Sequence, residues 1–256
     1  MTSLNQYQAA LNGVTIGRDT YYPGVGGTRG AVGSPPINQH DLRLEMRHGG
    51  AAGIDRYGTR TIKVPVQIAA TSEAHFDTLL GSLKDAWSPS DTDQELELRL
   101  GGTQLSYFGR PRGVDDSQLG GKALINSTGL VVCEFAATDP FGYGATVTVP
   151  ADTSTPVTLP NAGNAPTSRV TLTIVGSGGT PALVNTSDNA GDLTFTHTVS
   201  STLTVDLRAM TVRDGSTSRE SWLSIGSLWF ELQPGDNTVT FTGCTSVAAS
   251  IRPAYY

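Results

Sequence analysis

Short runs in which apolar and polar residues alternate recur along the second half of this chain and restrict its fold more than any other feature. Alternation is typical of a strand with one buried face, because successive side chains point to opposite faces of a sheet. Turn-forming Gly, Asn and Asp residues separate the runs, which predicts a β-sandwich of short antiparallel strands. The runs are Val170/Leu172/Ile174, Leu193/Phe195/His197, Leu203/Val205/Leu207, Met210/Val212, Trp229–Leu232, Val239/Phe241 and Val247/Ala249/Ile251.

A separate domain is expected ahead of the sandwich. The segment Pro150–Ser168 is rich in Pro, Thr and Asn, and its longest core-forming run is Val157–Leu159. We place the boundary at the start of this segment, which divides the chain into residues 1–149 and residues 150–256. A length of 256 residues accommodates two domains of this size.

The N-terminal half has the pattern of several strands and one helix. Alternation recurs over residues 41–47, 61–70, 95–100, 105–110 and 130–136. Between residues 72 and 87 the period changes, because Phe76, Leu79, Leu80 and Leu83 recur at helical spacing behind Ser72, a suitable N-cap. We therefore predict a mainly β protein, with an N-terminal β-barrel-like domain that packs one helix at about 72–87 and a C-terminal β-sandwich.

Two features of the N-terminal half suggest contacts with other subunits. Proline cannot donate to a strand ladder, so Pro65 inside the run Thr61–Ala70 predicts an exposed edge or a bulge. The Gly/Pro-rich tract Pro23–Pro36 lacks the pattern of a phosphate-binding loop, and we interpret it as a flexible arm that can lie across a neighbouring subunit. The predicted oligomer interface consists of Ile62, Val64, Pro65, Val66 and Ile68.

The sequence shows no constellation of catalytic or metal-binding residues. The four histidines have no metal-binding spacing, and there is no Gly-x-Ser-x-Gly motif. His197 lies on the apolar face of a predicted strand and is expected in the core. Cys133 and Cys244 are expected to be buried, free and inert. We therefore predict no catalytic residue, no metal and no cofactor.

Charge and hydropathy remove two further classes of partner. The net charge of −6 provides no positive field for a phosphate backbone, which argues against nucleic-acid binding. No apolar run is long enough for a membrane span. The first residues, Met1–Gln6, lack the pattern of a signal peptide, so we expect synthesis in the host cytoplasm without export by a classical signal.

A series of short motifs links the two halves. They are Tyr57–Ile62 before a strand, the helix at 72–87, the Asp-Pro with aromatic residues in Phe135–Tyr143, Asn161–Thr167, Thr180–Asn185 and Leu232–Val239. In this order they resemble the distal tail protein (Dit) family of phages with long non-contractile tails. The last motif contains Pro234–Asn237, whose composition predicts a hairpin between Trp229–Leu232 and Thr238–Phe241.

The resemblance implies a structural protein of the virion tail tip rather than an enzyme. Members of the family form a ring, a hexamer, that joins the tail tube to the tip hub and anchors receptor-binding or baseplate proteins. The N-terminal domains would build the ring, and a galectin-like C-terminal sandwich would project outward. The implied partners are further copies of the chain, the tail tube protein, the tape-measure protein, the tip hub protein and receptor-binding proteins.

Two other functional classes stay open at this point. Trp222 is a candidate glycan contact, because an exposed indole can stack on a sugar ring, and the chain would then be an adhesin module for host cell-surface glycans. Tyr143 is a second aromatic candidate for this role. Aromatic residues near strands more often fill a core. A glycosidase is the third class, since paired carboxylates meet in space rather than along the chain.

Overall fold

The computed structural model describes residues 4–17, 21–23, 28–31, 33–38, 42–43, 50–51, 56–117, 119, 128–188 and 191–256. The chain divides into two compact units, Met1–Gly142 together with Tyr256, and Tyr143–Tyr255. The boundary that we expected at residue 150 falls inside β13 (Val147–Asp152), a strand of the second unit. The Pro- and Thr-rich composition of this segment therefore marks an exposed strand at the rim of a sheet rather than a linker.

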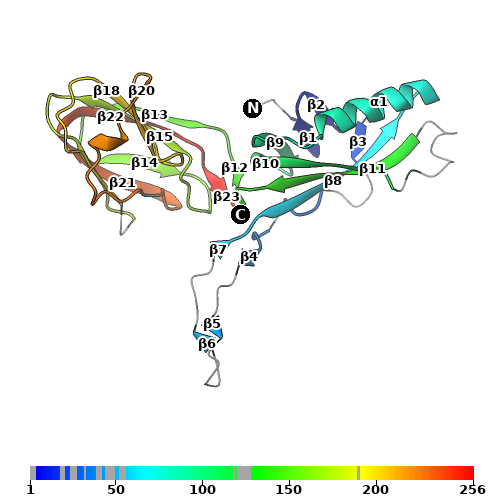
Figure 1. Cartoon of the computed structure of the whole chain (residues 1–256), viewed down its shortest axis with the longest axis horizontal. Coiled ribbons are helices and arrows are strands. Elements are labelled where there is room, and N and C mark those ends of the chain that lie inside the picture. The colour runs from blue at the N-terminus through cyan, green and yellow to red at the C-terminus, as the bar shows by residue number, and fades with distance from the viewer. Residues whose placement is uncertain are drawn as a thin grey trace. The chain divides into compact units, whose positions relative to one another are not determined.

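The N-terminal unit is an antiparallel sheet that nearly closes into a barrel, with strands in the order β2-β1-β9-β10-β11-β8-β3 (Figure 1). The outermost strands, β2 and β3, are consecutive in the chain, and the Gly17 amide donates to the Tyr21 carbonyl at 2.6 Å between them. The strands are β1 (Gln8–Leu11), β2 (Val14–Ile16), β3 (Tyr21–Pro23), β8 (Arg60–Ala69), β9 (Gln94–Leu100), β10 (Thr103–Asp115) and β11 (Thr128–Ala137).

The described chain between β3 and β8 forms two short strand pairs. Strand β4 (Ile37–Asn38) pairs with β7 (Arg56–Tyr57). Between these two strands in the sequence, β5 (Leu42–Arg43) pairs with β6 (Gly50–Ala51). The strand that we predicted over residues 41–47 is described only at β5, and its other residues lie outside the described chain.

The helix α1 (Glu73–Ala86) lies against β2, β8 and β10. It begins where predicted, because the Ser72 hydroxyl accepts from the His75 amide at 3.2 Å and caps the first turn. Phe76 and Leu83 are completely buried, and each such side chain contributes about 1.5–3 kcal/mol to the free energy of folding. The prediction of one packed helix is confirmed.

The C-terminal unit consists of two antiparallel sheets that share one core, which confirms the predicted sandwich. One sheet has the order β13-β22-β15-β18-β19-β20 and the other β14-β21-β16-β17. Leu172 and Leu203 from the first sheet meet Leu183 and Val239 from the second in one buried cluster. Besides β13, the elements are β14 (Val157–Asn161), β15 (Val170–Gly176), β16 (Ala182–Asn185), β17 (Gly191–Thr194), β18 (Thr202–Asp206), β19 (Thr211–Asp214), β20 (Thr217–Ser218), the 3-10 helix η1 (Glu220–Trp222), β21 (Gly235–Thr242) and β22 (Cys244–Ile251). Two short strands, β12 (Gly142–Tyr143) and β23 (Ala254–Tyr255), complete the element list.

The hairpin predicted around Pro234–Asn237 is wrong. Strand β21 pairs with β14 and β16, whereas Leu232 bridges Thr167, so Trp229–Leu232 never pairs with β21. The turn residues instead close a small loop, in which the Asn237 amide donates to the Gln233 carbonyl at 2.7 Å and its oxygen accepts from the Gln233 amide at 2.8 Å. Turn composition alone does not decide which strands pair.

A loop after η1 covers the outer edge of β17. Asp192 bridges Leu228, and Phe195 bridges Leu223. The Ser227 hydroxyl donates to the Thr194 carbonyl at 3.0 Å and also accepts from the Thr194 amide at 3.0 Å. The backbone groups at this edge are thus satisfied within the chain.

Candidate functional site

The predicted oligomer interface lies on β8, and the structure turns most of its side chains inward. Ile62, Val64, Val66 and Ile68 are 0–2 % exposed and belong to the core of the N-terminal unit. Only Pro65 is partly exposed, and it pairs with Val132 of β11. The prediction is wrong for the four aliphatic residues, because their alternation serves the core of their own chain.

The free edge that we predicted for β8 is also largely occupied. Strand β3 pairs with Val66–Ile68, and at Lys63 the backbone exchanges two hydrogen bonds with Arg29, at 2.9 and 3.0 Å. Among the described residues, the stretch around Pro65 between these two contacts has no paired strand on this side. The register shift of the sheet lies between Pro111 and Gly113 in β10, not at Pro65.

The described part of the glycine-rich tract is fixed to the barrel, in contrast to the flexible arm that we predicted. The Ala31 carbonyl accepts from Arg60 Nη1 at 2.8 Å and from Tyr107 Oη at 2.6 Å, and Arg60 Nη2 donates to the Gly33 carbonyl at 2.6 Å. Burial lowers the pKa of Arg60 and raises the pKa of Tyr107. We call Ala31, Arg60 and Tyr107 the carbonyl clamp. Residues 24–27 and 32 lie outside the described chain.

Gly30 permits this close approach. Its φ is +79°, in the left-handed region, and a Cβ atom there would lie 2.1 Å from the Thr61 carbonyl oxygen. Only a residue without a side chain fits this position. At Gly30 the tract therefore requires glycine for close packing against β8. The sequence pattern of the tract does not show this requirement.

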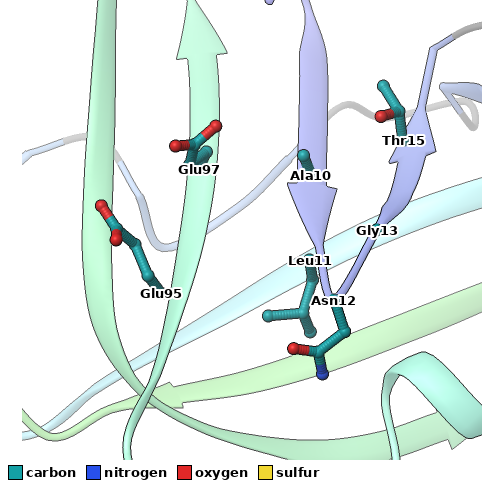
Figure 2. A pocket seen from close by; sticks show the side chains of 7 residues that line it. All are labelled: Ala10, Leu11, Asn12, Gly13, Thr15, Glu95 and Glu97. Atoms are coloured by element: carbon teal, nitrogen blue, oxygen red, sulfur yellow. The ribbon is translucent and has the colours of Figure 1, made fainter. Parts of the chain in front are cut away.

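A shallow hollow of about 430 Å³ opens beside β1, β2 and β9, and Figure 2 shows the residues around it. Ala10 and Gly13 add little or no side-chain volume to the lining. Asn12 is held in place, since its amide donates to the Ala86 carbonyl at 2.7 Å. The lining consists of Ala10, Leu11, Asn12, Gly13, Thr15, Glu95 and Glu97.

Two carboxylates, those of Glu95 and Glu97, give the hollow an acidic lining. Glu97 is 8 % exposed and accepts from Gln104 Nε2 at 3.4 Å. The polar side chains of the lining are those of Asn12, Thr15, Glu95 and Glu97. The described residues contain no group of three or more His, Cys, Asp or Glu side chains that could hold a metal ion. Glu95 and Glu97 alternate with leucines in a predicted strand, and this pattern gives no signal for a recess.

The candidate glycan contact Trp222 already has neighbours on its ring. His197 stacks on the indole with ring centres 5.5 Å apart and an angle of 12° between planes, and the Arg219 guanidinium lies 4.4 Å from the ring centre. Trp222 also packs against the sandwich core. His197 is exposed, not buried as predicted, because β17 ends at Thr194 before the alternation reaches it. A sugar could stack here only by displacing these partners.

The second aromatic candidate, Tyr143, is not accessible. Its ring is 1 % exposed, and the Arg169 guanidinium lies 4.6 Å from the ring centre. Tyr143 therefore acts as a packing residue. In the described part of the chain, no helix has the length and apolar character needed to cross a membrane.

Comparison with known proteins adds what the geometry alone does not give. Residues 162–255 match the family model of the siphovirus-type tail component, C-terminal domain. This C-terminal region is thus similar to the C-terminal domain of siphovirus-type tail components, and the match does not include the N-terminal unit. The resemblance to the Dit family that the sequence motifs indicated is confirmed for this C-terminal region.

The Dit fold extends over the whole chain. The structure is similar to Dit of phage SPP1, with a TM-score of 0.74, 18 % identity and coverage of 96 % of this chain and 98 % of that chain. It is also similar to a chain of the phage P2 baseplate in its activated conformation with Ca, with a TM-score of 0.55, 8 % identity and coverage of 96 % and 97 %. No curated protein sequence matches this chain.

Proposed function

We propose that this chain is the distal tail protein of a long-tailed phage, and that it forms a hexameric ring between the tail tube and the tip hub. The observation that carries the proposal is the extent of the Dit fold, which covers 96 % of this chain and 98 % of SPP1 Dit, a protein described as a paradigm of the hub adsorption apparatus in phages that infect Gram-positive bacteria. Nearly the whole length of the relative therefore has a counterpart here.

The chemistry of the described side chains supports a structural role. Burial raises the pKa of the thiols of both Cys133 and Cys244, whereas a nucleophilic cysteine needs a lowered pKa. Several charges on the N-terminal unit are paired with each other, as in Lys63–Glu134 at 2.5 Å and Lys84–Asp116 at 2.6 Å. These ion pairs are solvent-exposed and suit a stable surface rather than a site that binds a reactant.

In this proposal the ring contacts come from outward-facing groups. The inward face of β8 fills the core, and its second edge is blocked at Lys63 and at Val66–Ile68. We propose that neighbouring subunits recognise side chains on the outer surface of the barrel. The tail tube, tape-measure and hub proteins are the proposed further partners, together with receptor-binding proteins at the C-terminal domain.

Light scattering on the purified chain tests the ring. We expect the mass of a hexamer of 26.8 kDa chains, and ring-shaped particles in negative stain. A chain that stays monomeric at high concentration, and forms no ring when tail tube and hub proteins are added, would contradict the proposal.

The glycan-binding alternative gains no support from the position of Trp222. Its ring is engaged by His197 and Arg219, so we expect no saturable signal on a glycan array. A saturable signal that Trp222→Ala abolishes, while Trp229→Ala leaves it intact, would favour an adhesin over a purely structural protein.

A further inference from the structure

Residues 224–228 of the C-terminal unit cover the outer edge of β17 without burying any of their own side chains. Ile225 is completely exposed and Leu228 is 54 % exposed, although both are apolar. Ser224 and Ser227 are only partly buried, and Gly226 is exposed. We call residues 224–228 the cover segment. Its contact with β17 gains little from the burial of apolar surface, the main driving force of folding.

Hydrogen bonds hold the cover segment on β17. The Ser224 amide donates to the Thr194 carbonyl at 2.8 Å. The Leu228 amide donates to the Asp192 carbonyl at 2.7 Å, and the Asp192 amide donates to the Leu228 carbonyl at 3.1 Å. The Ser227 hydroxyl adds two bonds to the backbone of Thr194. Water can replace each of these partners when the segment moves away, so breaking the bonds has a small net cost.

The chain that follows the cover segment is fixed in the sandwich core. Phe230 and Leu232 are 2 % and 0 % exposed. The carbonyls of residues 231–233 accept hydrogen bonds from three asparagine side chains that are 0–1 % exposed: Asn185 donates to Glu231 at 3.3 Å, Asn161 to Leu232 at 3.0 Å and Asn237 to Gln233 at 2.7 Å. We call Asn161, Asn185 and Asn237 the asparagine clasp.

The asparagine clasp resists opening far more than the bonds of the cover segment do. Its members come from β14, β21 and β16, which are adjacent strands of one sheet. Leu232 also exchanges two backbone hydrogen bonds with Thr167, at 2.8 and 2.9 Å. Because these side chains are buried, removal of residues 231–233 would leave polar groups unpaired in the core, which is costly.

We propose that the cover segment is a strap that opens locally over the edge of β17, and that the asparagine clasp stops this opening before residue 230. At the other end of the strap, Leu223 packs against the sandwich core and limits the opening there. The open strap frees the backbone groups of Asp192 and Thr194, to which a further strand could be added. The strap thus controls access to this edge. It is a property of the single chain and does not depend on the ring that we propose above.

Hydrogen exchange on the full chain with a reversible lock tests the strap. Asp192→Cys with Leu228→Cys, in a Cys244→Ala background, allows a disulfide to close the strap, because these two residues lie opposite each other in a β-bridge. In the reduced chain we expect the amides of residues 192, 224 and 228 to exchange at least about tenfold faster than those of residues 232 and 233. In the oxidised chain the three strap amides should slow at least about tenfold, while the amides of residues 232 and 233 keep their rates.

A second variant tests the strap without added cysteines. Ser227→Ala removes both side-chain bonds to Thr194 but leaves the backbone bonds of residues 192, 224 and 228 intact. We expect these three amides to exchange about tenfold faster than in the parent chain, whereas Ser200→Ala, at an exposed position outside the strap, should change no rate. Equal exchange of residues 192, 224, 228, 232 and 233 in the parent chain would overturn the strap. Strap rates that neither the disulfide nor Ser227→Ala changes would overturn it as well.

Discussion

Arg60 and Tyr107 donate hydrogen bonds to the same acceptor, the backbone carbonyl of Ala31, at 2.8 and 2.6 Å. They come from β8 and β10, so two strands of the barrel hold one crossing segment. The Arg60 guanidinium also lies 5.8 Å from the centre of the Tyr107 ring. This carbonyl clamp replaces the flexible arm that the glycine-rich sequence suggested.

Removal of either donor should lower the free energy of unfolding. We expect Tyr107→Phe to lose about 0.5–1.5 kcal/mol, the net value of a hydrogen bond, and Arg60→Ala to lose about 2–4 kcal/mol, because two carbonyls lose a charged donor. Urea denaturation measures both. Arg112→Ala, at an exposed position of β10, serves as the control and should change stability by less than about 0.5 kcal/mol. Equal losses in Arg60→Ala and Arg112→Ala would contradict the clamp.

Stability should fall at alkaline pH, in part through Tyr107. Burial raises the pKa of Tyr107 above its usual value of 10.0, so the folded chain keeps a proton that the unfolded chain has already lost. The contribution is fully present below about pH 10 and is lost as the pH rises through the folded pKa. Tyr107→Phe should therefore show a shallower decline between about pH 9.5 and 11 in urea titrations. Identical slopes would show that Tyr107 does not contribute.

Two glycine-to-alanine changes should have opposite effects. Gly30→Ala places a Cβ 2.1 Å from a backbone oxygen at positive φ, so we expect a loss of at least about 1–3 kcal/mol. Gly81→Ala lies inside α1, where a Cβ meets no atom within 4 Å, and should gain about 0.5–1 kcal/mol. Thermal unfolding of the two variants beside the parent chain checks both signs. A stable Gly30→Ala would mean that the tract does not pack as described.

The two cysteines should differ in reactivity. Cys133 is completely buried and its pKa is strongly raised by burial, whereas Cys244 is only partly buried. We expect an aromatic disulfide reagent to label Cys244 slowly and Cys133 only after unfolding. Mass spectrometry of the labelled native chain identifies the site. Fast labelling of Cys133 without denaturant would disprove its burial.

Local pattern predicted the parts of this fold that depend on neighbours in the sequence. Ser72 with Phe76 and Leu83 predicts α1, and the alternation around Leu96 predicts β9, because capping and periodicity act within a few residues. The interface prediction failed for the four aliphatic residues of β8, since alternation shows that a strand has an apolar face but not which surface covers it. A strand with one apolar face has the same sequence pattern whether that face packs into its own core or against another subunit.

Long-range contacts account for the remaining errors. Arg60 and Ala31 are 29 positions apart, and Tyr107 and Ala31 are 76 apart, so nothing in the glycine-rich tract itself indicates the carbonyl clamp. Leu232 pairs with Thr167 instead of β21, because strands compete for partners across the whole domain. The hollow at Glu95 and Glu97 depends on the small size of Ala10 on a neighbouring strand, a coincidence that no local motif records.

The loop that covers β17 affects how copies of this chain can associate with one another. An open sheet edge is a template on which a second chain can add a strand, and identical domains held close together are at greatest risk of such polymerisation. Here the hydrogen bonds of Asp192 to Leu228 and of Thr194 to Ser227 occupy that edge. In the proposed ring, neighbouring copies can therefore lie side by side without forming a fibre through β17.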